Sequence, residues 1–468
     1  MNQTTLLRIY AAMACSVSAL ALLPMGSVTA AKRASRPADY DARARQIVAQ
    51  MTLDEKIAQL HGTVDRTHGR VVIGLPRLGI PDLTITNGPA GMGPAGPGHE
   101  GKATALPAPI ALAATWDVKA ARTHGEIAAD EAALLGNLLL ESPDINIART
   151  PHNGRTFESF GEDPVLSGAL AVANIHGVQS RRVLANVKHY TANNQETNRF
   201  KVNDDIDERT LRELYLPHFE AAVKEGHVDS VMGAYNKVNG AYCCENEYLL
   251  DKVLKGDWKF EGFVTSDFGA VHSTVPTAQH GLDVEMPTGI YWGDALKKAV
   301  KSGEVPESLL DEKLVRRFRT MMHRGVWDQQ PKRGPIPVEK NAASARKLGA
   351  EGVVLLKNAN GQLPLQAEKI HSIALLGPYA RFAMTGGDGS SRVNPIHTVS
   401  PGDGLRNAVG KDVTIQEDDG KDVGKAVTAA RAADIAILML GDRQSEGADH
   451  PITLAGNQDA LAEAVLAA

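Results

Sequence analysis

The sequence predicts an α/β protein in which a (β/α)8-type barrel is followed by a second, smaller α/β unit. Three observations lead to this prediction. Short, β-rich apolar runs alternate with helical patterns from roughly residue 40 to 325, a polar, proline-rich stretch follows at 326–337, and further apolar runs come after it. Strands that alternate with helices are typical of parallel sheets, and so long a repeat favours a barrel over an open sheet.

The strands predicted for the first unit are short and apolar. They cover residues 83–86, 145–148, 184–190, 230–236 and 262–268. Between them, residues 207–226 have the periodicity of an amphipathic helix. Its predicted apolar stripe consists of Leu211, Leu214, Tyr215, His218, Phe219 and Ala222.

The second unit has the same alternation on a smaller scale. Its predicted buried parallel strands are residues 353–358, 373–378, 413–416 and 435–440, with a helix at 422–434. The last residues, 455–468, have a helical pattern that no strand follows. A doubly wound sheet normally continues after such a helix, so we expect this unit to be incomplete. The predicted boundaries are 31–325 for the barrel, 326–344 for the linker and 345–468 for the second domain.

The first thirty residues have the features of a secretory signal peptide. Arg8 precedes a mostly apolar stretch at 9–23, and small residues lead to a cleavage site after Ala30. The apolar stretch is short for a membrane span. We therefore expect an exported protein, periplasmic or secreted, with no membrane span.

The bulk composition excludes several kinds of partner and ligand. With 50 Lys and Arg against 55 Asp and Glu, the net charge of −5 favours neither nucleic acid nor an anionic membrane. Cys243 and Cys244 are adjacent and poorly placed to bridge each other. The 15 histidines show no zinc-ligand spacing, so we expect no metal and no cofactor. No particular oligomeric state is predicted.

Polar side chains stand at or after the ends of five predicted strands. In a parallel barrel the catalytic groups lie where the strands end at the carboxyl face. Buried charges are costly unless they are paired, so a convergent cluster of them indicates a polar ligand with many hydroxyl groups, such as a sugar. The donors in this set are Arg155, Lys188 and His189, and the acceptors are Asn87, Tyr235 and Asp267.

Four motifs make the sequence resemble a known family. "NGRTFESFGEDP", "VKHY", "MGAYNKVNG" and "GFVTSDFGA" are similar to segments of glycoside hydrolase family 3, which includes secreted β-glucosidases and β-xylosidases. The resemblance covers roughly residues 40–468. It implies a TIM-like (β/α)8 barrel followed by an α/β sandwich domain, and it implies a β-linked oligosaccharide or glycoside as substrate.

The resemblance also implies roles for particular residues. Asp267 would be the nucleophile, and Glu446, on a loop of the sandwich domain, the acid/base. Positions that hold the sugar are matched by Arg155, Lys188, His189, Tyr235 and Asn87. Most members have Asp where Asn87 stands, so the charge is absent here, although an amide can still donate and accept. Phe268, where many members have Trp, would shape the aglycone side.

These roles describe a retaining exo-β-glucosidase that uses two carboxyl groups. The nucleophile must be ionised and the acid protonated, so we expect the surroundings of Glu446 to raise its pKa. Two alternatives remain open at this point. The enzyme could be a β-xylosidase or of mixed specificity, because the two sugars differ by one hydroxymethyl group. The chain could also be a non-catalytic sugar-binding remnant, if the short second domain failed to hold Glu446 in place.

Overall fold

The computed structural model describes residues 37–64, 70–93 and 101–468. The chain divides into two units, Met1–Arg36 and Pro37–Ala468, and everything below concerns the second. The predicted signal peptide, residues 1–30, lies outside the described residues, so export stays a prediction.

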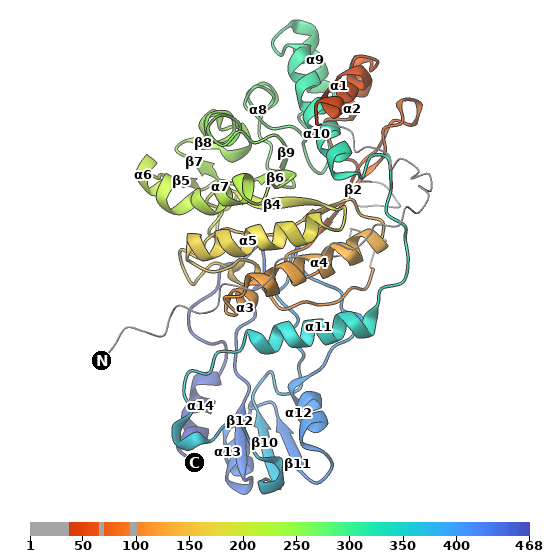
Figure 1. Cartoon of the computed structure of the whole chain (residues 1–468). Helices are drawn as coiled ribbons and strands as arrows, with labels where there is room; N and C mark the ends of the chain where they lie inside the picture. Colours follow the sequence, from red (N-terminus) through yellow and green to blue (C-terminus); the bar gives the residue numbers. More distant parts are fainter. Residues whose placement is uncertain (1–36, 65–69, 94–100) are drawn as a thin grey trace, which may run out of the picture. The chain divides into compact units, whose positions relative to one another are not determined.

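The first domain is built on a strongly buried, mostly parallel sheet (Figure 1). Only β1 pairs antiparallel with its neighbour β2, and the later pairs are parallel. Both faces of β4, β6 and β9 are buried, as expected for strands that helices cover. In sheet order the strands are β1 (Val71–Val72), β2 (Leu83–Asn87), β3 (Leu139–Glu141), β4 (Leu184–Tyr190), β6 (Ser230–Gly233) and β9 (Phe263–Ser266).

Single bridges close this sheet into a ring. Thr265 of β9 bridges to Val284, Glu285 bridges to His61, and Thr63 bridges to Val71 of β1. The two short extended segments thus connect the last strand of the sheet to the first. The predicted TIM-like barrel is confirmed. Two of its strand positions, at residues 61–63 and 284–285, are occupied by segments that form only isolated bridges.

Helices pack around the barrel between successive strands. Helix α5 begins at a proline that follows an N-cap aspartate. Pro164 occupies its first turn, and the Asp163 carboxylate accepts hydrogen bonds from the backbone N–H groups of Val165 and Leu166. The helices are α1 (Pro37–Val48), α2 (Leu53–Ala58), α3 (Pro109–Ala113), α4 (Val118–Leu134), α5 (Pro164–Gln179), α6 (Glu208–Thr210), α7 (Pro217–Lys224), α8 (Val275–Gln279), α9 (Asp294–Ser302) and α10 (Glu307–Arg324), with a π-helical segment at Tyr248–Asp257. A small sheet is formed by β5 (Asn203–Asp204), β7 (Lys237–Val238) and β8 (Ala241–Tyr242).

The helix predicted at 207–226 is broken in the structure. Helix α6 runs into a π-helical turn, Leu211–Tyr215, and α7 starts only at Pro217. A proline has no backbone N–H and cannot continue the preceding helix. Four of the six residues of the predicted stripe are buried, namely Leu211, His218, Phe219 and Ala222.

The strand predicted at 145–148 is wrong. The strand at this point of the sheet is β3, which ends at Glu141, and the chain then passes through Pro143. Proline cannot donate to a ladder, so pairing is reduced to one bridge between Asp144 and Lys188. Residues 145–148 follow this bridge as irregular chain.

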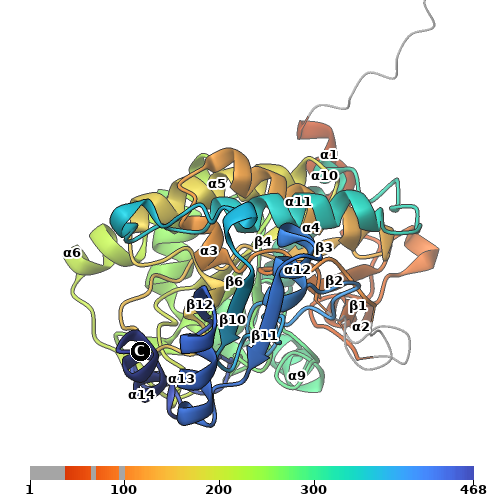
Figure 2. The same cartoon turned by 90° about the horizontal axis from the view of Figure 1, so that it is seen from below.

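The second domain is a small parallel sheet with helices beside it. Figure 2 shows β10 between β11 and β12. Ala374 and Leu376 of β10 pack against Ala426 of α13 and Leu461 of α14. The elements of this domain are β10 (Ser372–Leu376), α12 (Pro401–Val409), β11 (Thr414–Asp418), α13 (Val423–Ala432), β12 (Ile435–Leu438) and α14 (Gln458–Leu466). Helix α11 (Val338–Glu351) precedes them and packs on the barrel, where Leu348 joins the core and Asn341 donates to Glu131.

One prediction about the start of this domain is corrected. Helix α11 covers the last part of the predicted linker, 338–344, and the bounds of linker and domain stay a prediction. Residues 353–358, predicted as a buried strand, form no strand, and the side chains of Val353 and Leu356 are 77% and 92% exposed. An apolar run becomes a strand only where another strand pairs with it, and the described residues give this run no such neighbour.

Candidate active site

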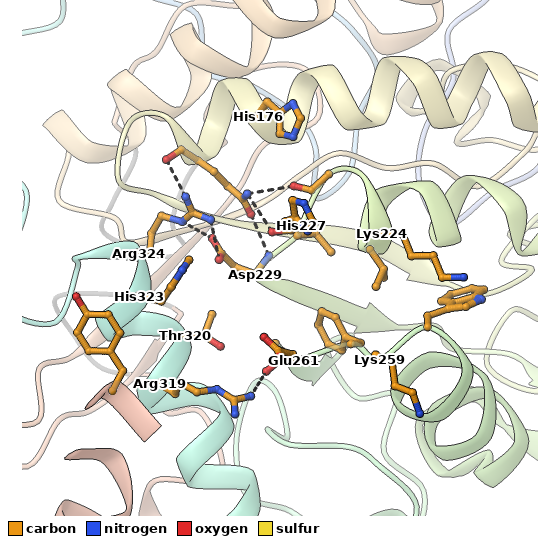
Figure 3. Close-up of a pocket in the computed structure, with 18 residues that line it drawn as sticks. His176, Lys224, His227, Asp229, Lys259, Glu261, Arg319, Thr320, His323 and Arg324 are labelled. Carbon is orange, nitrogen blue, oxygen red and sulfur yellow. Dashed lines mark hydrogen bonds and ion pairs between the residues drawn. The ribbon is translucent and has the colours of Figure 1, made fainter. Parts of the chain in front are cut away.

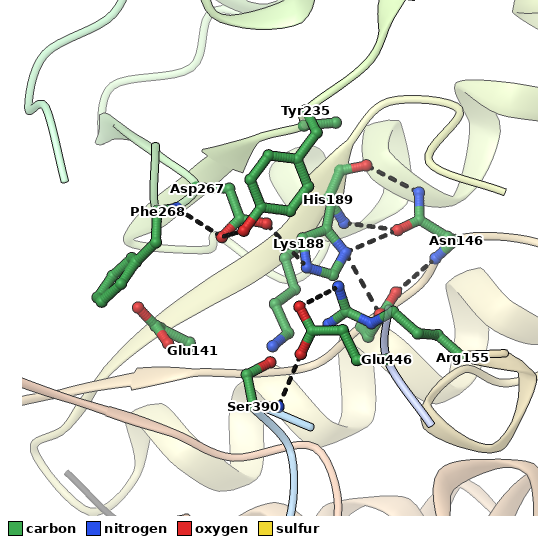
Figure 4. Close-up of polar contacts among 12 residues, drawn as sticks. Glu141, Asn146, Arg155, Lys188, His189, Tyr235, Asp267, Phe268, Ser390 and Glu446 are labelled. Carbon is green, nitrogen blue, oxygen red and sulfur yellow. Dashed lines mark hydrogen bonds and ion pairs between the residues drawn. The ribbon is translucent and has the colours of Figure 1, made fainter. Parts of the chain in front are cut away.

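Six of the predicted site residues come together at the carboxyl ends of the barrel strands. Asn87 ends β2, Lys188 and His189 lie in β4, and Asp267 directly follows β9. Tyr235 follows β6, and Phe268 comes after Asp267. Because parallel strands end at one edge, side chains far apart in the sequence converge there (Figure 4).

The two carboxylate oxygens of Asp267 differ in their surroundings. Oδ1 accepts hydrogen bonds from the Tyr235 hydroxyl at 2.9 Å and from the Phe268 backbone N–H at 2.7 Å. Oδ2 is buried and has no hydrogen-bond partner among the described residues. The carboxylate is therefore fixed through one oxygen, and the other remains available to react.

His189 lies on the unpaired side of this carboxylate. Asn146 donates its Nδ2–H to the His189 carbonyl, so its Oδ1 accepts from the backbone N–H and from Nδ1 of His189, both at 2.9 Å. The ring proton is thus on Nδ1, and Nε2 lies 3.5 Å from Asp267 Oδ2. Burial and the nearby charge of Arg155 lower the pKa of His189, which keeps the ring neutral.

A buried ion-pair network lies beside these two residues. Lys188 Nζ donates to Asn87 Oδ1 at 2.8 Å and lies 3.1 Å from Glu158 Oε1. Arg155 donates two hydrogen bonds to Glu158, at 2.9 and 2.7 Å, and its third nitrogen, Nη1, has no hydrogen-bond partner. Burial alone would raise the pKa of Glu158, but the charges of Arg155 and Lys188 outweigh it and lower the pKa. Glu158 holds two donors in place, a role that its polar motif alone did not reveal.

Glu446 reaches the same site from the second domain. It lies in a loop that follows β12, and its Oε1 is 3.6 Å from the free nitrogen of Arg155. Arg199 donates to Oε1 at 2.8 Å, and the Ser390 backbone N–H donates to Oε2 at 2.7 Å. Neither partner could be predicted from the sequence, because a backbone amide carries no sequence signal and Arg199 lies in a loop outside the recognised motifs.

The expectation that the surroundings of Glu446 raise its pKa is wrong. Burial does act in that direction. Arg155, the Ser390 hydrogen bond and Arg199 outweigh burial, and together they lower the pKa of this carboxyl. In this arrangement Glu446 is ionised at neutral pH.

Tyr235 and Arg199 connect the two carboxylates. The Arg199 guanidinium lies over the Tyr235 ring, 4.6 Å from its centroid, while Tyr235 bonds to Asp267 and Arg199 bonds to Glu446. All the predicted polar site residues therefore belong to one continuous set of contacts. Both carboxylates, from different domains, border the same space (Figure 4).

Phe268 follows Asp267, and its ring packs against Arg70. The guanidinium of Arg70 lies over its ring, 4.5 Å from the centroid, and Arg70 also forms an ion pair with the buried Glu141. The Phe268 side chain is partly buried against the core. An aromatic side chain in the residue that follows Asp267 is suited to contact a sugar ring or its aglycone.

A pocket of about 750 Å³ lies at the opposite ends of the strands (Figure 3). Asp229 and Gly262, which line it, directly precede β6 and β9. Several of its charges are already paired, since Arg324 bonds to Asp229 and Arg319 to Asp41. Catalytic groups of barrels lie at the carboxyl ends of the strands, so we assign the site to the Asp267 cluster and not to this pocket.

The described residues contain neither a group of potential metal ligands nor a membrane-spanning helix. In residues 37–64, 70–93 and 101–468, no three His, Cys, Asp or Glu side chains are grouped so that they could hold a metal ion. No helix in these ranges is long and apolar enough to cross a membrane.

Comparison with known families gives a match over most of the chain. Residues 70–320 match the glycosyl hydrolase family 3 N-terminal domain, and residues 353–468 match the corresponding C-terminal domain. A β-glucosidase of Rhizobium radiobacter is 42% identical over 370 residues, which are 78% of this chain and 44% of that protein. Thermostable β-glucosidase B of Acetivibrio thermocellus is 38% identical over 440 residues, which are 90% of this chain and 58% of that protein. The chain thus spans about half the length of these relatives.

Solved structures show the same similarity. The β-glucosidase DesR of Streptomyces venezuelae, in complex with D-glucose, superposes with a TM-score of 0.85 at 31% identity, over 90% of this chain and 70% of that one. β-Glucosidase 3B of Thermotoga neapolitana, in complex with glucose, gives a TM-score of 0.82 at 31% identity, over 90% and 66% of the two chains.

Proposed function

Since this chain belongs to glycosyl hydrolase family 3, we propose that it is a retaining exo-β-glucosidase. It would release terminal β-D-glucosyl residues from oligosaccharides or glucosides. The names of its relatives, and the glucose bound in two similar structures, support glucose as the sugar.

One observation carries the proposal. Asp267, fixed through Oδ1 and free at Oδ2, and Glu446, brought from the second domain, border one space. Hydrolysis with retention needs two such carboxyl groups, one to attack the anomeric carbon and one to exchange protons with the leaving oxygen. Around them, the unpaired nitrogen of Arg155 and the Lys188 ammonium can donate to sugar hydroxyls.

The proposed reaction has two steps. First, Glu446, which is ionised in the arrangement described above and must take up a proton from water before this step, gives that proton to the glycosidic oxygen. The bond from this oxygen to the anomeric carbon breaks, and Asp267 Oδ2 bonds to this carbon. Next, Glu446 takes a proton from water, whose oxygen bonds to the anomeric carbon and releases the Asp267 carboxylate. Two inversions at the same carbon give net retention.

The lowered pKa of Glu446 leads to a prediction about pH dependence. A general acid must be protonated in the free enzyme, so kcat/KM falls as pH rises above its pKa. Arg199 lowers that pKa, so Arg199→Gln should raise it and move the basic limb of the kcat/KM profile to higher pH. The measurement is the profile with 4-nitrophenyl β-glucoside. The control is Arg209→Gln, whose ion pair with Glu213 is exposed. A basic limb that stays in place in R199Q would remove Glu446 from the acid role.

The direct test of the proposed function compares two substrates. The purified protein should hydrolyse 4-nitrophenyl β-D-glucoside with a higher kcat/KM than the β-xyloside, and NMR should show β-glucose as the first product. A higher kcat/KM for the xyloside would indicate a β-xylosidase, and first appearance of α-glucose would contradict retention. Glucose binding by calorimetry without turnover of either substrate would indicate a sugar-binding remnant.

A further inference from the structure

The loop that carries Glu446 is attached to both domains. Within its own domain it pairs with Asp388, whose backbone exchanges hydrogen bonds with Gln444 and Glu446 at 3.1 Å each. We call residues 441–452 the docking loop, because they also contact two loops of the barrel. The Gln444 side chain accepts from the Phe157 N–H at 3.0 Å, and the His450 N–H donates to the His152 carbonyl at 2.9 Å.

Asp449 accepts three hydrogen bonds across the domain boundary. Its Oδ1 accepts from the backbone N–H of Glu196 at 2.8 Å and of Gly154 at 3.3 Å, and its Oδ2 accepts from the N–H of Thr197 at 2.9 Å. One side chain of the second domain thus joins two separate loops of the barrel. Burial opposes its ionisation, but these hydrogen bonds outweigh burial and lower the pKa of Asp449, so it acts as an anion.

A second contact comes from Gly447, the residue that directly follows Glu446 in the sequence. The Gly447 N–H donates to Glu196 Oε2 at 2.7 Å, and the same carboxylate oxygen accepts from Arg199 at 2.7 Å. Arg199 in turn donates to Glu446. The segment 193–199 of the barrel therefore touches the docking loop at Asp449, at Gly447 and at Glu446 itself.

The two surfaces meet too closely to slide. A Cβ on Gly154 would overlap the carbonyl oxygens of Ser445 and Ala448, so the backbones lie against each other there. A glycine at this place permits the close approach that brings its N–H to Asp449. Movement of Asp449 would consequently shift Glu446, three residues earlier in the same tight loop.

We propose that Asp449 is a positioning residue that holds Glu446 over Asp267 by docking its loop onto the barrel. This inference rests on the proposed function. Asp449 does not touch the site, so its effect should come through the acid/base step alone. A displacement of about 1 Å in a catalytic group can cost roughly 10²-fold in rate.

The test uses the dependence on leaving group. A good leaving group such as 2,4-dinitrophenolate departs without protonation, whereas the glucose released from cellobiose needs the acid. Asp449→Ala should lower kcat/KM for cellobiose by about 10-fold to 10²-fold, and change kcat/KM for 2,4-dinitrophenyl β-glucoside little. Asp449→Asn keeps an acceptor at Oδ1 but turns a donor toward the Thr197 N–H, so it should give an intermediate loss.

Asp434→Ala is the matched control. Asp434 also accepts two backbone N–H groups, from His371 at 2.8 Å and Ser372 at 2.9 Å, but these lie within the second domain. It should leave the ratio of the two kcat/KM values unchanged. Equal losses on both substrates in D449A and D449N, or no loss, would overturn the proposal, provided that the wild type hydrolyses both. Failure of the wild type on both substrates would instead overturn the proposed function.

Discussion

Replacement of Asp267 by Asn is expected to lower kcat/KM for 2,4-dinitrophenyl β-glucoside by about 10⁴-fold or more, because a nucleophile is the group whose removal costs most. Asn has nearly the same volume and can keep the hydrogen bonds from Tyr235 and the Phe268 N–H through its oxygen. Its amide group cannot form the ester with the anomeric carbon. This substrate needs no acid, so the loss would report the nucleophile alone.

Asp229→Asn is the matched control for this variant. Asp229 is also a buried Asp next to a barrel strand, but it lies at the amino end of β6. There it pairs with Arg324, at the face opposite the site. Its replacement should cost stability and leave kcat/KM within a few-fold of the wild type. Full turnover by D267N would exclude Asp267 as the nucleophile.

Replacement of Glu446 by Ala should give the second large effect. For cellobiose we expect kcat/KM to fall by about 10²-fold to 10⁴-fold, the usual contribution of a general acid. For 2,4-dinitrophenyl β-glucoside the first step should survive and the second should become limiting, since no base activates water. Added azide needs no base, so it should restore kcat and give β-glucosyl azide as product.

Glu463→Ala serves as the control here, since this exposed side chain lies in α14 of the same domain. It should need no azide and form no glucosyl azide. If azide did not change kcat of E446A, and the variant kept its activity on cellobiose, the acid/base would have to be another residue.

The barrel and most of its site follow from local features of the sequence. A parallel strand buried on both faces is a nearly continuous apolar run, so β4, β6 and β9 could be located, and with them Lys188, His189 and Asp267 at their ends. Because the carboxyl ends of parallel barrel strands lie at one face, those residues can be grouped into one site without any measured distance.

The features that could not be predicted depend on contacts between distant segments of the chain. Residues 353–358 have the composition of a strand, but whether they pair is decided by a neighbouring strand. The lowered pKa of Glu446 could not be predicted, because the charge of Arg155, the N–H of Ser390 and the charge of Arg199 reach this carboxyl only in the folded chain. The role of Asp449 could not be predicted for the same reason, since the three N–H groups that it accepts hydrogen bonds from lie on the barrel.

The most direct test of the central claim is to trap the reaction halfway. A 2-fluoro substituent slows both steps, and a 2,4-dinitrophenyl leaving group speeds only the first, so 2,4-dinitrophenyl 2-deoxy-2-fluoro-β-glucoside should accumulate the ester on the wild-type protein. Peptide mass spectrometry should then find one fluoroglucosyl group, carried by Asp267. A label on any other side chain, or hydrolysis of ordinary glucosides without any trapped ester, would contradict the assignment of Asp267 as nucleophile of a retaining glucosidase.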